Sequence, residues 1–333
     1  MRYDEDDVRV RPGRGTRPRT KERPRHADAT TGFVTAVDRG RFTCLVGGSP
    51  VVAMRARELG RHSVVVGDRV ALVGDVSSQR GSLARIVRIE PRSSVLRRTA
   101  DDVDPVERVI VAGADQLVVV MSLADPDPVP RLVDRCLVAA YDAGIDPLLC
   151  LTKADLASPD ALLAAYEPLG VAHVVLGTDE TGTGPLAGLG ALRDRLAGRI
   201  SVLVGHSGVG KSTIVNELVP EARRRTGTVN DVTGRGRHTS SSAVALPLPE
   251  GGWVVDTPGV RSFGLAHVGA ATVLEAFPEL YEAAADCPTD CAHTDAAVPE
   301  CALDAAVASG RASPARLASF RRLLESRPAH EGD

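Results

Sequence analysis

A glycine-rich octapeptide that ends in lysine and serine is the segment of this sequence with the clearest chemistry. It matches Gly-x-x-x-x-Gly-Lys-Ser, the pattern of a phosphate-binding loop between a strand and a helix, and it follows the apolar run 200–204. Backbone N–H groups of such a loop surround the phosphates, and the N-terminus of the next helix adds partial positive charge. We expect a nucleotide to contact the loop and the first helical turn, namely Gly205, His206, Ser207, Gly208, Val209, Gly210, Lys211, Ser212 and Thr213.

Side chains that could hold Mg²⁺ occur in this loop and about 45 residues beyond it. Lys211 is expected to reach the β- and γ-phosphates, while the hydroxyl of Ser212 would bind the magnesium ion. Asp256 ends an apolar run and begins the sequence Asp-Thr-Pro-Gly. A carboxylate at such a strand end holds Mg²⁺ through water, so we assign this role to Asp256 and expect Gly259 to sense the γ-phosphate.

The segment 226–242 lies between these two motifs. It is rich in Gly, Thr, Ser and Arg and has no apolar periodicity. Segments of this kind become ordered around the γ-phosphate in nucleotide-dependent switches. Thr239 is the candidate for a further Mg²⁺ ligand, with Thr226, Thr228 and Thr233 as alternatives.

A second short motif, Thr152-Lys153-Ala154-Asp155, follows the apolar run 147–151. The carboxylate of Asp155 can accept two hydrogen bonds from N1–H and N2–H₂ of guanine, whereas adenine has no such pair of donors. The stem of Lys153 would lie over the base. Only three of the 40 basic residues are lysines, and two of those three lie in the two nucleotide motifs.

The order of the motifs is unusual, because the base-reading motif precedes the phosphate loop by about fifty residues. In an ordinary GTPase this order is reversed. A βα sheet whose ends meet can be cut and rejoined without losing its site. The sequence therefore predicts a circularly permuted GTPase domain that binds GTP and GDP.

A cysteine and histidine cluster near the C-terminus has the spacing of metal ligands, Cys-x₃-Cys-x-His-x₇-Cys. Its members are Cys287, Cys291, His293 and Cys301. Three thiolates and one imidazole fill the tetrahedral shell of Zn²⁺ and leave no open position, which predicts one structural zinc ion. The other three cysteines lie in apolar runs and are expected in the core.

The elements that position these groups fall into four predicted units: 1–30, a disordered basic arm; 31–92, an OB-type β-barrel that binds RNA; 93–270, an α/β GTPase domain; and 271–333, a mainly helical zinc domain. In the second unit, five short strands are expected at 32–37, 42–46, 51–55, 69–74 and 83–89, which fits an OB-type or, alternatively, an SH3-like barrel.

Strands and helices alternate in the third unit. We expect strands at 117–121, 147–151, 171–176, 200–204, 243–247 and 253–256, and helices at 130–141, 159–166, 185–197 and 211–219. Continuous apolar strands of this kind predict a parallel sheet covered on both faces. Residues 91–116 are predicted as a linker. The stretch 314–327 is predicted as a packing helix, with RNA contact by Arg316, Arg321 and Arg322 as the alternative.

Charge is distributed unevenly along the 333 residues, although the net charge is only −3. Residues 31–100 carry twelve basic and five acidic side chains, and residues 9–25 carry eight basic side chains and one acidic side chain. A basic front on an acidic body predicts a polyanionic partner such as RNA. We found neither an apolar run of the roughly 18 residues that span a membrane nor a signal peptide, and expect a cytoplasmic monomer without a membrane partner.

Taken together, the barrel, the permuted order of motifs, the phosphate loop and the Cys-Cys-His-Cys cluster resemble the ribosome small-subunit-dependent GTPase A (RsgA) family over about residues 31–325. The resemblance implies slow GTP hydrolysis that the small ribosomal subunit stimulates, contact with its rRNA, and a role in the late maturation of that subunit. Arg237-His238-Thr239 resembles the switch segment of the family. The base motif of the family usually begins with Asn, whereas this chain has Thr152 at that position.

The residue that orients the attacking water is not evident from the motifs. Val260 stands where many GTPases keep a glutamine, and a valine cannot position water. His238, beside Thr239, is our hypothesis for the catalytic residue.

Two alternatives to a GTP-hydrolysing assembly factor stay open at this point. One is a GTP-gated RNA- or ribosome-binding module in which hydrolysis is incidental, a reading that Val260 favours. The other is a small-molecule kinase that uses the same phosphate loop. Asp155 argues against ATP, and nothing in residues 270–333 supplies an acceptor pocket.

Overall fold

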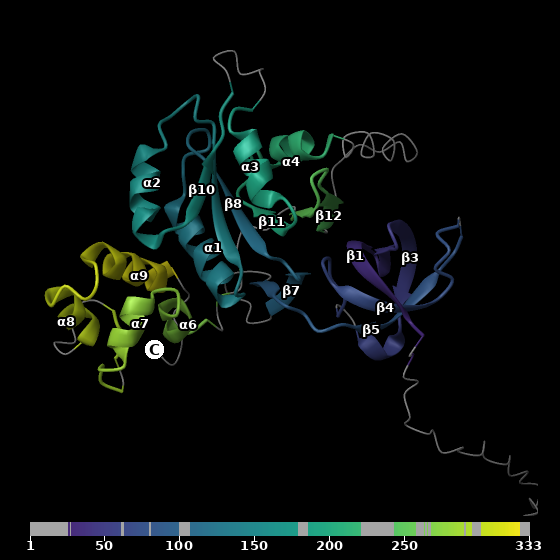
Figure 1. Cartoon of the computed structure of the whole chain (residues 1–333), viewed down its shortest axis with the longest axis horizontal. Helices are drawn as coiled ribbons and strands as arrows, with labels where there is room; N and C mark the ends of the chain where they lie inside the picture. Colours follow the sequence, from purple (N-terminus) through teal and green to yellow (C-terminus); the bar gives the residue numbers. More distant parts are fainter. Residues whose placement is uncertain are drawn as a thin grey trace, which may run out of the picture.

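The computed structural model describes residues 26, 28–60, 63–79, 81–99, 107–178, 186–220, 243–257, 263, 265, 268–289, 291–294 and 301–326. Nearly all of the predicted basic arm lies outside the described residues. The described chain forms a barrel, a central α/β sheet and a group of C-terminal helices. The barrel and the C-terminal helices lie on opposite sides of the central sheet (Figure 1).

Five strands form the barrel: β1 (Thr30–Asp38), β2 (Arg41–Val46), β3 (Ser49–Arg55), β4 (Arg69–Gly74) and β5 (Ala84–Ile89). Their order is β1-β2-β3-β5-β4, and a β1–β4 pairing closes the barrel. Strands β3 and β5 are parallel, whereas the other neighbouring pairs are antiparallel. This arrangement confirms the predicted OB-type barrel. A short 3₁₀ helix (Arg57–Leu59) follows β3.

The barrel closes around alternate side chains of its strands. The β2–β3 turn consists of Gly47 and Gly48, which both have positive φ (55° and 85°). Such a two-residue turn matches the right-handed twist of the hairpin and favours glycine at both positions. The inward side chains, among them Val34, Phe42 and Ile86, are almost fully buried.

The central sheet has the order β10-β9-β8-β11-β13-β12. Its strands are β8 (Gln116–Ser122), β9 (Asp146–Thr152), β10 (Ala172–Val175), β11 (Ile200–Val204), β12 (Val244–Pro247) and β13 (Trp253–Asp256). The pairings are parallel except that β12 is antiparallel to β13. The expectation of a wholly parallel sheet is therefore wrong at this edge. The short Gly251-Gly252 turn joins β12 to β13 directly and forces the antiparallel pair.

Helices cover both faces of the sheet, as predicted. Helices α1 (Pro130–Asp142) and α2 (Asp160–Tyr166) lie on one face, and α3 (Leu189–Leu196) and α4 (Lys211–Leu218) on the other. In β8, Leu117, Val119 and Met121 join the core under α1, while Val118 and Val120 join the core under α3 and α4. All seven residues of β8 are buried, which makes it a central strand. A 3₁₀ helix (Glu167–Leu169) follows α2.

The prediction of a linker at residues 91–116 is wrong for most of this segment. It contains an antiparallel hairpin of β6 (Val95–Thr99) and β7 (Glu107–Ala112) and the first residue of β8. Leu96 and Val111 of this hairpin are buried in the core of the central domain. Adjacent arginines at 97 and 98 interrupt the apolar pattern, so the hairpin is recognisable only from its tertiary packing.

The C-terminal unit consists of α6 (Ala270–Leu274), α7 (Pro278–Ala284), α8 (Ala302–Ala308) and α9 (Pro314–Ser326). Helix α9 packs against α1 and α6 through Leu317, Phe320, Leu323 and Leu324, which confirms the predicted packing helix. Its arginines 316, 321 and 322 form ion pairs with Glu279, Asp304 and Asp134. These pairs argue against the alternative in which the same arginines contact RNA. No helix among the described residues has the length and apolar character of a membrane span.

Candidate functional site

The phosphate loop connects β11 to α4 at the carboxyl edge of the central sheet. Its glycines adopt backbone conformations that other residues rarely take, with φ of 149° at Gly205, 85° at Gly208 and 98° at Gly210. A Cβ atom at Gly205 would lie 2.3 Å from the carbonyl oxygen of Val120. Val209 is buried and anchors the loop on the sheet. The sequence therefore builds a tight turn of the kind whose backbone N–H groups cradle an anion.

The ammonium group of Lys211 lies within this loop. Its Nζ donates hydrogen bonds to the carbonyl oxygens of Gly205 (2.5 Å) and His206 (2.6 Å). Burial lowers the pKa of Lys211, and the nearby carboxylate of Asp256 opposes that shift. Ser212 and Thr213 are exposed in the first turn of α4, where a hydroxyl can reach a metal ion or a phosphate.

Asp256 ends β13 beside the phosphate loop. It lies opposite Leu203 in the parallel β11–β13 pair, and the buried hydroxyl of Thr257 donates a hydrogen bond to the carbonyl oxygen of Leu203 (2.7 Å). Burial raises the pKa of Asp256, while Lys211 and the backbone N–H of Thr257 act in the opposite direction. A half-buried carboxylate suits a divalent cation, because the cation would offset the cost of burying the negative charge.

Thr152, the first residue of the base motif, contacts the phosphate loop directly. Its hydroxyl donates a hydrogen bond to the carbonyl oxygen of Val209 (2.7 Å) and lies 3.4 Å from that of Met121. Thr152 and Val209 are 57 residues apart in the sequence, and they meet because β9 and β11 flank β8 in parallel. The expected convergence of the motifs at one edge is thus observed, and the shorter threonine side chain still spans the gap.

Lys153 reaches the loop that follows β8. Its Nζ donates a hydrogen bond to the carbonyl oxygen of Asp125. Pro126 of the same loop comes within 3.6 Å of the position that a Cβ atom would have on Gly208. This loop was not among the predicted site segments, and it joins the base motif to the phosphate loop.

Asp155 is exposed and lies beside the end of β10. Its Oδ1 accepts a hydrogen bond from the backbone N–H of Thr178 (2.9 Å), which is the largest cause of its lowered pKa. At Gly177, a Cβ atom would lie 3.3 Å from the same Oδ1, so a larger residue would crowd this carboxylate. Gly177 and Thr178 were missed because they act through the backbone. The only sequence signal was a small residue after the third predicted strand.

Three predicted site residues lie outside the described residues: His238, Thr239 and Gly259. The same holds for Val260 and for the alternatives Thr226, Thr228 and Thr233. The described part of the site therefore comprises the base motif, the phosphate loop and Asp256.

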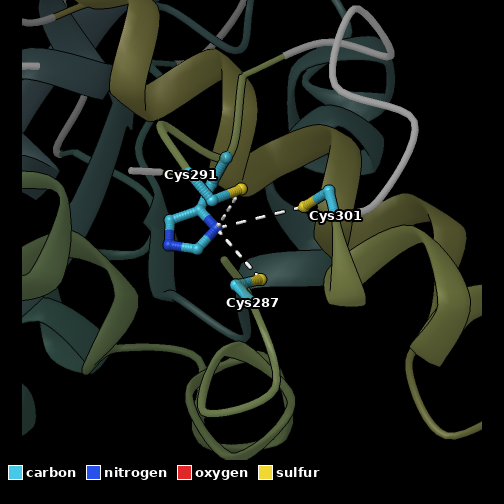
Figure 2. Close-up of side chains that lie close together, drawn as sticks. Cys287, Cys291 and Cys301 are labelled. Atoms are coloured by element: carbon cyan, nitrogen blue, oxygen red, sulfur yellow. Dashed lines mark hydrogen bonds between the residues drawn. The ribbon is translucent and has the colours of Figure 1, made fainter. Parts of the chain in front are cut away.

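The Cys/His cluster forms at the junction of α7, α8 and α9. One ligand atom from each of Cys287, Cys291, His293 and Cys301 lies within 4.8 Å of all the others. The Nδ1 atom of His293 is 3.6, 3.5 and 3.9 Å from the sulfur atoms of Cys287, Cys291 and Cys301. Figure 2 shows the three sulfur atoms around one side of the imidazole. Such a set of four donors could hold a metal ion.

Neighbouring groups hold the cluster in place. The backbone N–H of Ala302 donates to the sulfur of Cys287 (3.3 Å). Arg321 donates to the carbonyl oxygen of His293 (3.2 Å) and forms two hydrogen bonds with the carboxylate of Asp304 (3.0 and 2.7 Å). Burial and the charge of Arg321 lower the pKa of His293, which favours the neutral imidazole that binds metals.

Comparison with known proteins gives a consistent result. A family model described as RsgA GTPase matches residues 89–266. A relative called small ribosomal subunit biogenesis GTPase RsgA, from Gemmatimonas aurantiaca, is 40% identical over 267 residues, which cover 80% of this chain and 85% of the relative. A relative with the same name from Azotobacter vinelandii is 41% identical over 276 residues, which cover 81% and 76%.

Two solved structures share the fold. One is YjeQ from Thermotoga maritima, with a TM-score of 0.63, 24% identity, and coverage of 89% of this chain and 97% of that chain. The other is YloQ, described as a circularly permuted GTPase, with a TM-score of 0.62, 20% identity, and coverage of 93% and 100%. The predicted architecture of OB-type barrel, permuted GTPase domain and C-terminal helices is therefore confirmed.

Proposed function

This chain belongs to the RsgA GTPase family and is a GTP-hydrolysing enzyme, and we propose that it assists the late maturation of the small ribosomal subunit, which stimulates its turnover. The observation that carries the GTP-binding part of the proposal is the contact between Thr152 and Val209, because it joins the proposed guanine-reading motif to the phosphate loop at one edge of the sheet. The names of the relatives support the choice of the small ribosomal subunit as partner.

The residues of the site divide by the part of GTP that they would bind. Asp155 reads the guanine edge, Lys153 covers the base, and Thr152 with Ala154 holds the motif. The loop from Gly205 to Thr213 holds the phosphates, with Lys211 on the β- and γ-phosphates. Gly259 senses the γ-phosphate, and His238 orients the attacking water.

Two metal ions belong to this proposal. Ser212, Thr239 and Asp256 would hold Mg²⁺ with GTP, where the cation neutralises charge on the phosphates. Cys287, Cys291, His293 and Cys301 would hold one structural Zn²⁺, since thiolate and imidazole donors at this separation suit a closed tetrahedral site. The zinc ion would tie the segment before α8 to the end of α7.

The barrel supplies a surface that suits ribosomal RNA. Arg41 and Arg85 lie opposite Met54 on neighbouring strands, so the three side chains form one row on the outer face. Both arginines are exposed, and Met54 is 47% exposed. Arginines on either side of an apolar side chain can contact phosphates while the centre packs against riboses. Residues 31–92 would thus be the RNA-binding domain, with the arm 1–30 adding positive charge.

Replacing both arginines, as Arg41→Ala/Arg85→Ala, tests this surface. We expect weaker binding to the small subunit. The slope of log affinity against log salt concentration should also become shallower by about one for each phosphate contact that is lost. Arg57→Ala is the matched control, because Arg57 is exposed on the 3₁₀ helix outside this row. Equal losses in both variants would contradict the assignment of this face.

The proposed domain limits are 93–270 for the GTPase domain and 271–333 for the zinc domain.

Because the proposed partner is a ribosomal subunit, we place the protein in the cytoplasm, where it would act as a monomer. GTPase rate measured against small-subunit concentration, with the large subunit as control, tests the whole proposal. Saturable stimulation by the small subunit alone is expected, and equal rates with both subunits would contradict it.

The alternative of a GTP-gated binding module is distinguished by turnover. In that case GTP would increase affinity for the subunit, while hydrolysis would stay slow when the subunit is bound. The variant His238→Ala separates the steps further, since it should lose stimulated turnover and retain GTP binding. Unchanged stimulated turnover would remove His238 from the mechanism.

A further inference from the structure

Strand β1 of the barrel is shared between two partners along one edge. Its first residues, Thr30–Phe33, pair with β4 and close the barrel. The register of β1 on β2 then shifts between Val34 and Ala36, as in a β-bulge. After this bulge, Ala36 pairs with Val244 of β12. Because a bulge bends its strand and re-aims it, the end of β1 reaches the sheet of the GTPase domain through Ala36, while Val37 and Asp38 still pair with β2 of the barrel.

The pairing continues from the barrel to the proposed magnesium site. Val244 lies opposite Ala36 on one side and opposite Asp256 on the other. Ala36, Val244 and Asp256 therefore form one row across β1, β12 and β13. Neighbouring strands lie about 4.8 Å apart, so two strand spacings separate the backbone of the barrel from that of Asp256.

The opposite end of β13 also contacts the barrel. The ring of Phe33 lies 5.0 Å from that of Trp253, centroid to centroid, at an interplanar angle of 45°. Phe33 and Val37 of β1 both pack against the core of the GTPase domain. The backbone N–H of Trp253 donates to the carbonyl oxygen of Arg199 (2.7 Å). Since β13 has only four residues, contacts at both of its ends fix its position.

The junction beside this ring contact is hollow. A cavity of about 500 Å³ separates the barrel from the amino edge of the central sheet, and Phe33 and Trp253 both line it. It lies at the starts of β11 and β13, away from the phosphate loop at their carboxyl ends. A shift of the barrel therefore reaches β13 through the ring contact and the β1–β12 pair.

We propose that Phe33 is a positioning residue for the GTPase site and that β1 sets the position of Asp256 toward Mg²⁺. A partner that binds the barrel would act on the metal site through β1, β12 and β13. The inference rests on the proposed role of Asp256 as a magnesium ligand. Phe33 lies beside Trp253, at the end of β13 opposite Asp256, and acts through this ring contact.

The Mg²⁺ dependence of nucleotide binding tests this route without relying on turnover. Affinity for a fluorescent, non-hydrolysable GTP analogue is measured over a range of Mg²⁺ concentrations and in EDTA. For Phe33→Ala we expect the Mg²⁺ midpoint to rise at least about fivefold, as for a typical coupled site, with affinity in EDTA unchanged. Phe33→Leu, which keeps apolar volume but loses the ring, should shift the midpoint in the same direction by less.

The matched control is Val76→Ala, because Val76 is half-buried against the barrel core and belongs to neither β1 nor β12. Its midpoint should match that of the unaltered protein. A midpoint unchanged in both Phe33 variants would overturn the proposal. Nucleotide affinity that falls as much in EDTA as in the presence of Mg²⁺ would also overturn it. The fluorescence of Trp253, the only tryptophan, gives a second readout, since it should change when Mg²⁺ is added to the unaltered nucleotide-bound protein.

Asp256→Asn separates this inference from the function on which it rests. If Asp256→Asn leaves the Mg²⁺ midpoint unchanged, the assignment of Asp256 as a magnesium ligand fails. If Asp256→Asn raises the midpoint and the Phe33 variants do not, only the route through the barrel fails.

Discussion

The hydroxyl of Thr152 donates a 2.7 Å hydrogen bond to the carbonyl oxygen of Val209, so the motif proposed to read the base holds the loop proposed to bind the phosphates. Both groups are buried. Replacing one partner with an apolar residue leaves the other without a hydrogen bond, at a cost of about 1–2 kcal/mol. We expect Thr152→Val to lower affinity for GDP and GTP by about 5- to 30-fold, measured by titration with a fluorescent guanine nucleotide.

Thr152→Ser is the control for this prediction, because serine retains the hydroxyl. It should keep most of the affinity. If Thr152→Val binds as tightly as the unaltered protein, the hydrogen bond does not position the phosphate loop.

The proposed selection of guanine by Asp155 predicts a change of base preference on substitution. In Asp155→Asn an amide nitrogen replaces one acceptor oxygen, and it faces the N1–H and N2–H₂ donors of guanine. We expect GTP affinity to fall by about 100-fold or more, since buried or paired polar groups left without partners discriminate strongly. Xanthosine triphosphate, which has an acceptor at position 2, should bind the variant better than GTP in a competition assay.

ATP provides the control for base selection. It should compete weakly with GTP for the unaltered protein and for the variant alike. Equal binding of ATP and GTP to the unaltered protein would show that Asp155 does not read the base.

The two carboxylates of the site predict different responses to pH. Burial raises the pKa of Asp256, whereas the N–H of Thr178 lowers that of Asp155. As pH falls, Asp256 is therefore protonated first, and protons compete with Mg²⁺ at this residue. At limiting Mg²⁺, we expect the rate of GTP hydrolysis to decline on the acid side at a pH above the pKa of an ordinary carboxyl group. Excess Mg²⁺ should move this decline to lower pH.

Nucleotide binding in EDTA serves as the comparison for this pH dependence. It should stay constant over the same range, because Asp155 remains ionised there. A parallel decline in EDTA would assign the titration to a group outside the metal site.

The strands of this protein could be predicted where local pattern and turns agree. Strand β4 matches its predicted bounds of 69–74, and β11 and β13 match 200–204 and 253–256. Each is a run of apolar residues bounded by turn-forming residues. The β6–β7 hairpin escaped because its stability comes from Leu96 and Val111 packing on a distant core. The β1–β12 pair escaped because Ala36 and Val244 are 208 residues apart and carry no motif.

In the candidate site, too, some groups could be predicted from the sequence and others could not. Side chains with a proposed chemical role, such as Lys211, Asp155 and the four members of the Cys/His cluster, were recognisable from residue type and spacing. Backbone groups carry no such signature, so the N–H of Thr178 and the carbonyl oxygen of Asp125 appear only in three dimensions.

The Cys/His cluster predicts that metal removal loosens the C-terminal helices. In Cys291→Ser one of four ligands is lost, and structural zinc sites supply much of the folding free energy of small domains. We expect the zinc content to fall from about one ion per chain to nearly none, and protease to cut near α8 much faster. GTP binding should be retained, since the phosphate loop belongs to another unit.

Cys150→Ala is the matched control for metal loss, because Cys150 is fully buried in β9. It should retain zinc. Zinc content unchanged in Cys291→Ser would contradict the assignment of this cluster.

The ion pair between Arg322 of α9 and Asp134 of α1 predicts how firmly the C-terminal helices are attached. Its atoms are 3.2 Å apart, the side chain of Asp134 is only 5% exposed, and Arg322 also stacks on the ring of Tyr166 at 5.0 Å. In Arg322→Ala this carboxylate stays buried without its cationic partner and keeps only the hydroxyl of Tyr166. We expect the free energy of unfolding to fall by about 1–3 kcal/mol, measured by urea denaturation, because a buried charge loses its compensation.

The pH dependence of that loss identifies its cause. Burial already raises the pKa of Asp134 and Arg322 opposes the shift, so removing Arg322 raises it further. A carboxyl group with a raised pKa destabilises the folded state when it ionises, and the loss should therefore shrink as pH is lowered from 7 toward 5. Arg311→Ala, which removes an exposed arginine outside this pair, should show neither effect. A loss in Arg322→Ala that is constant with pH would mean that lost packing on Tyr166, and not the buried carboxylate, causes the instability.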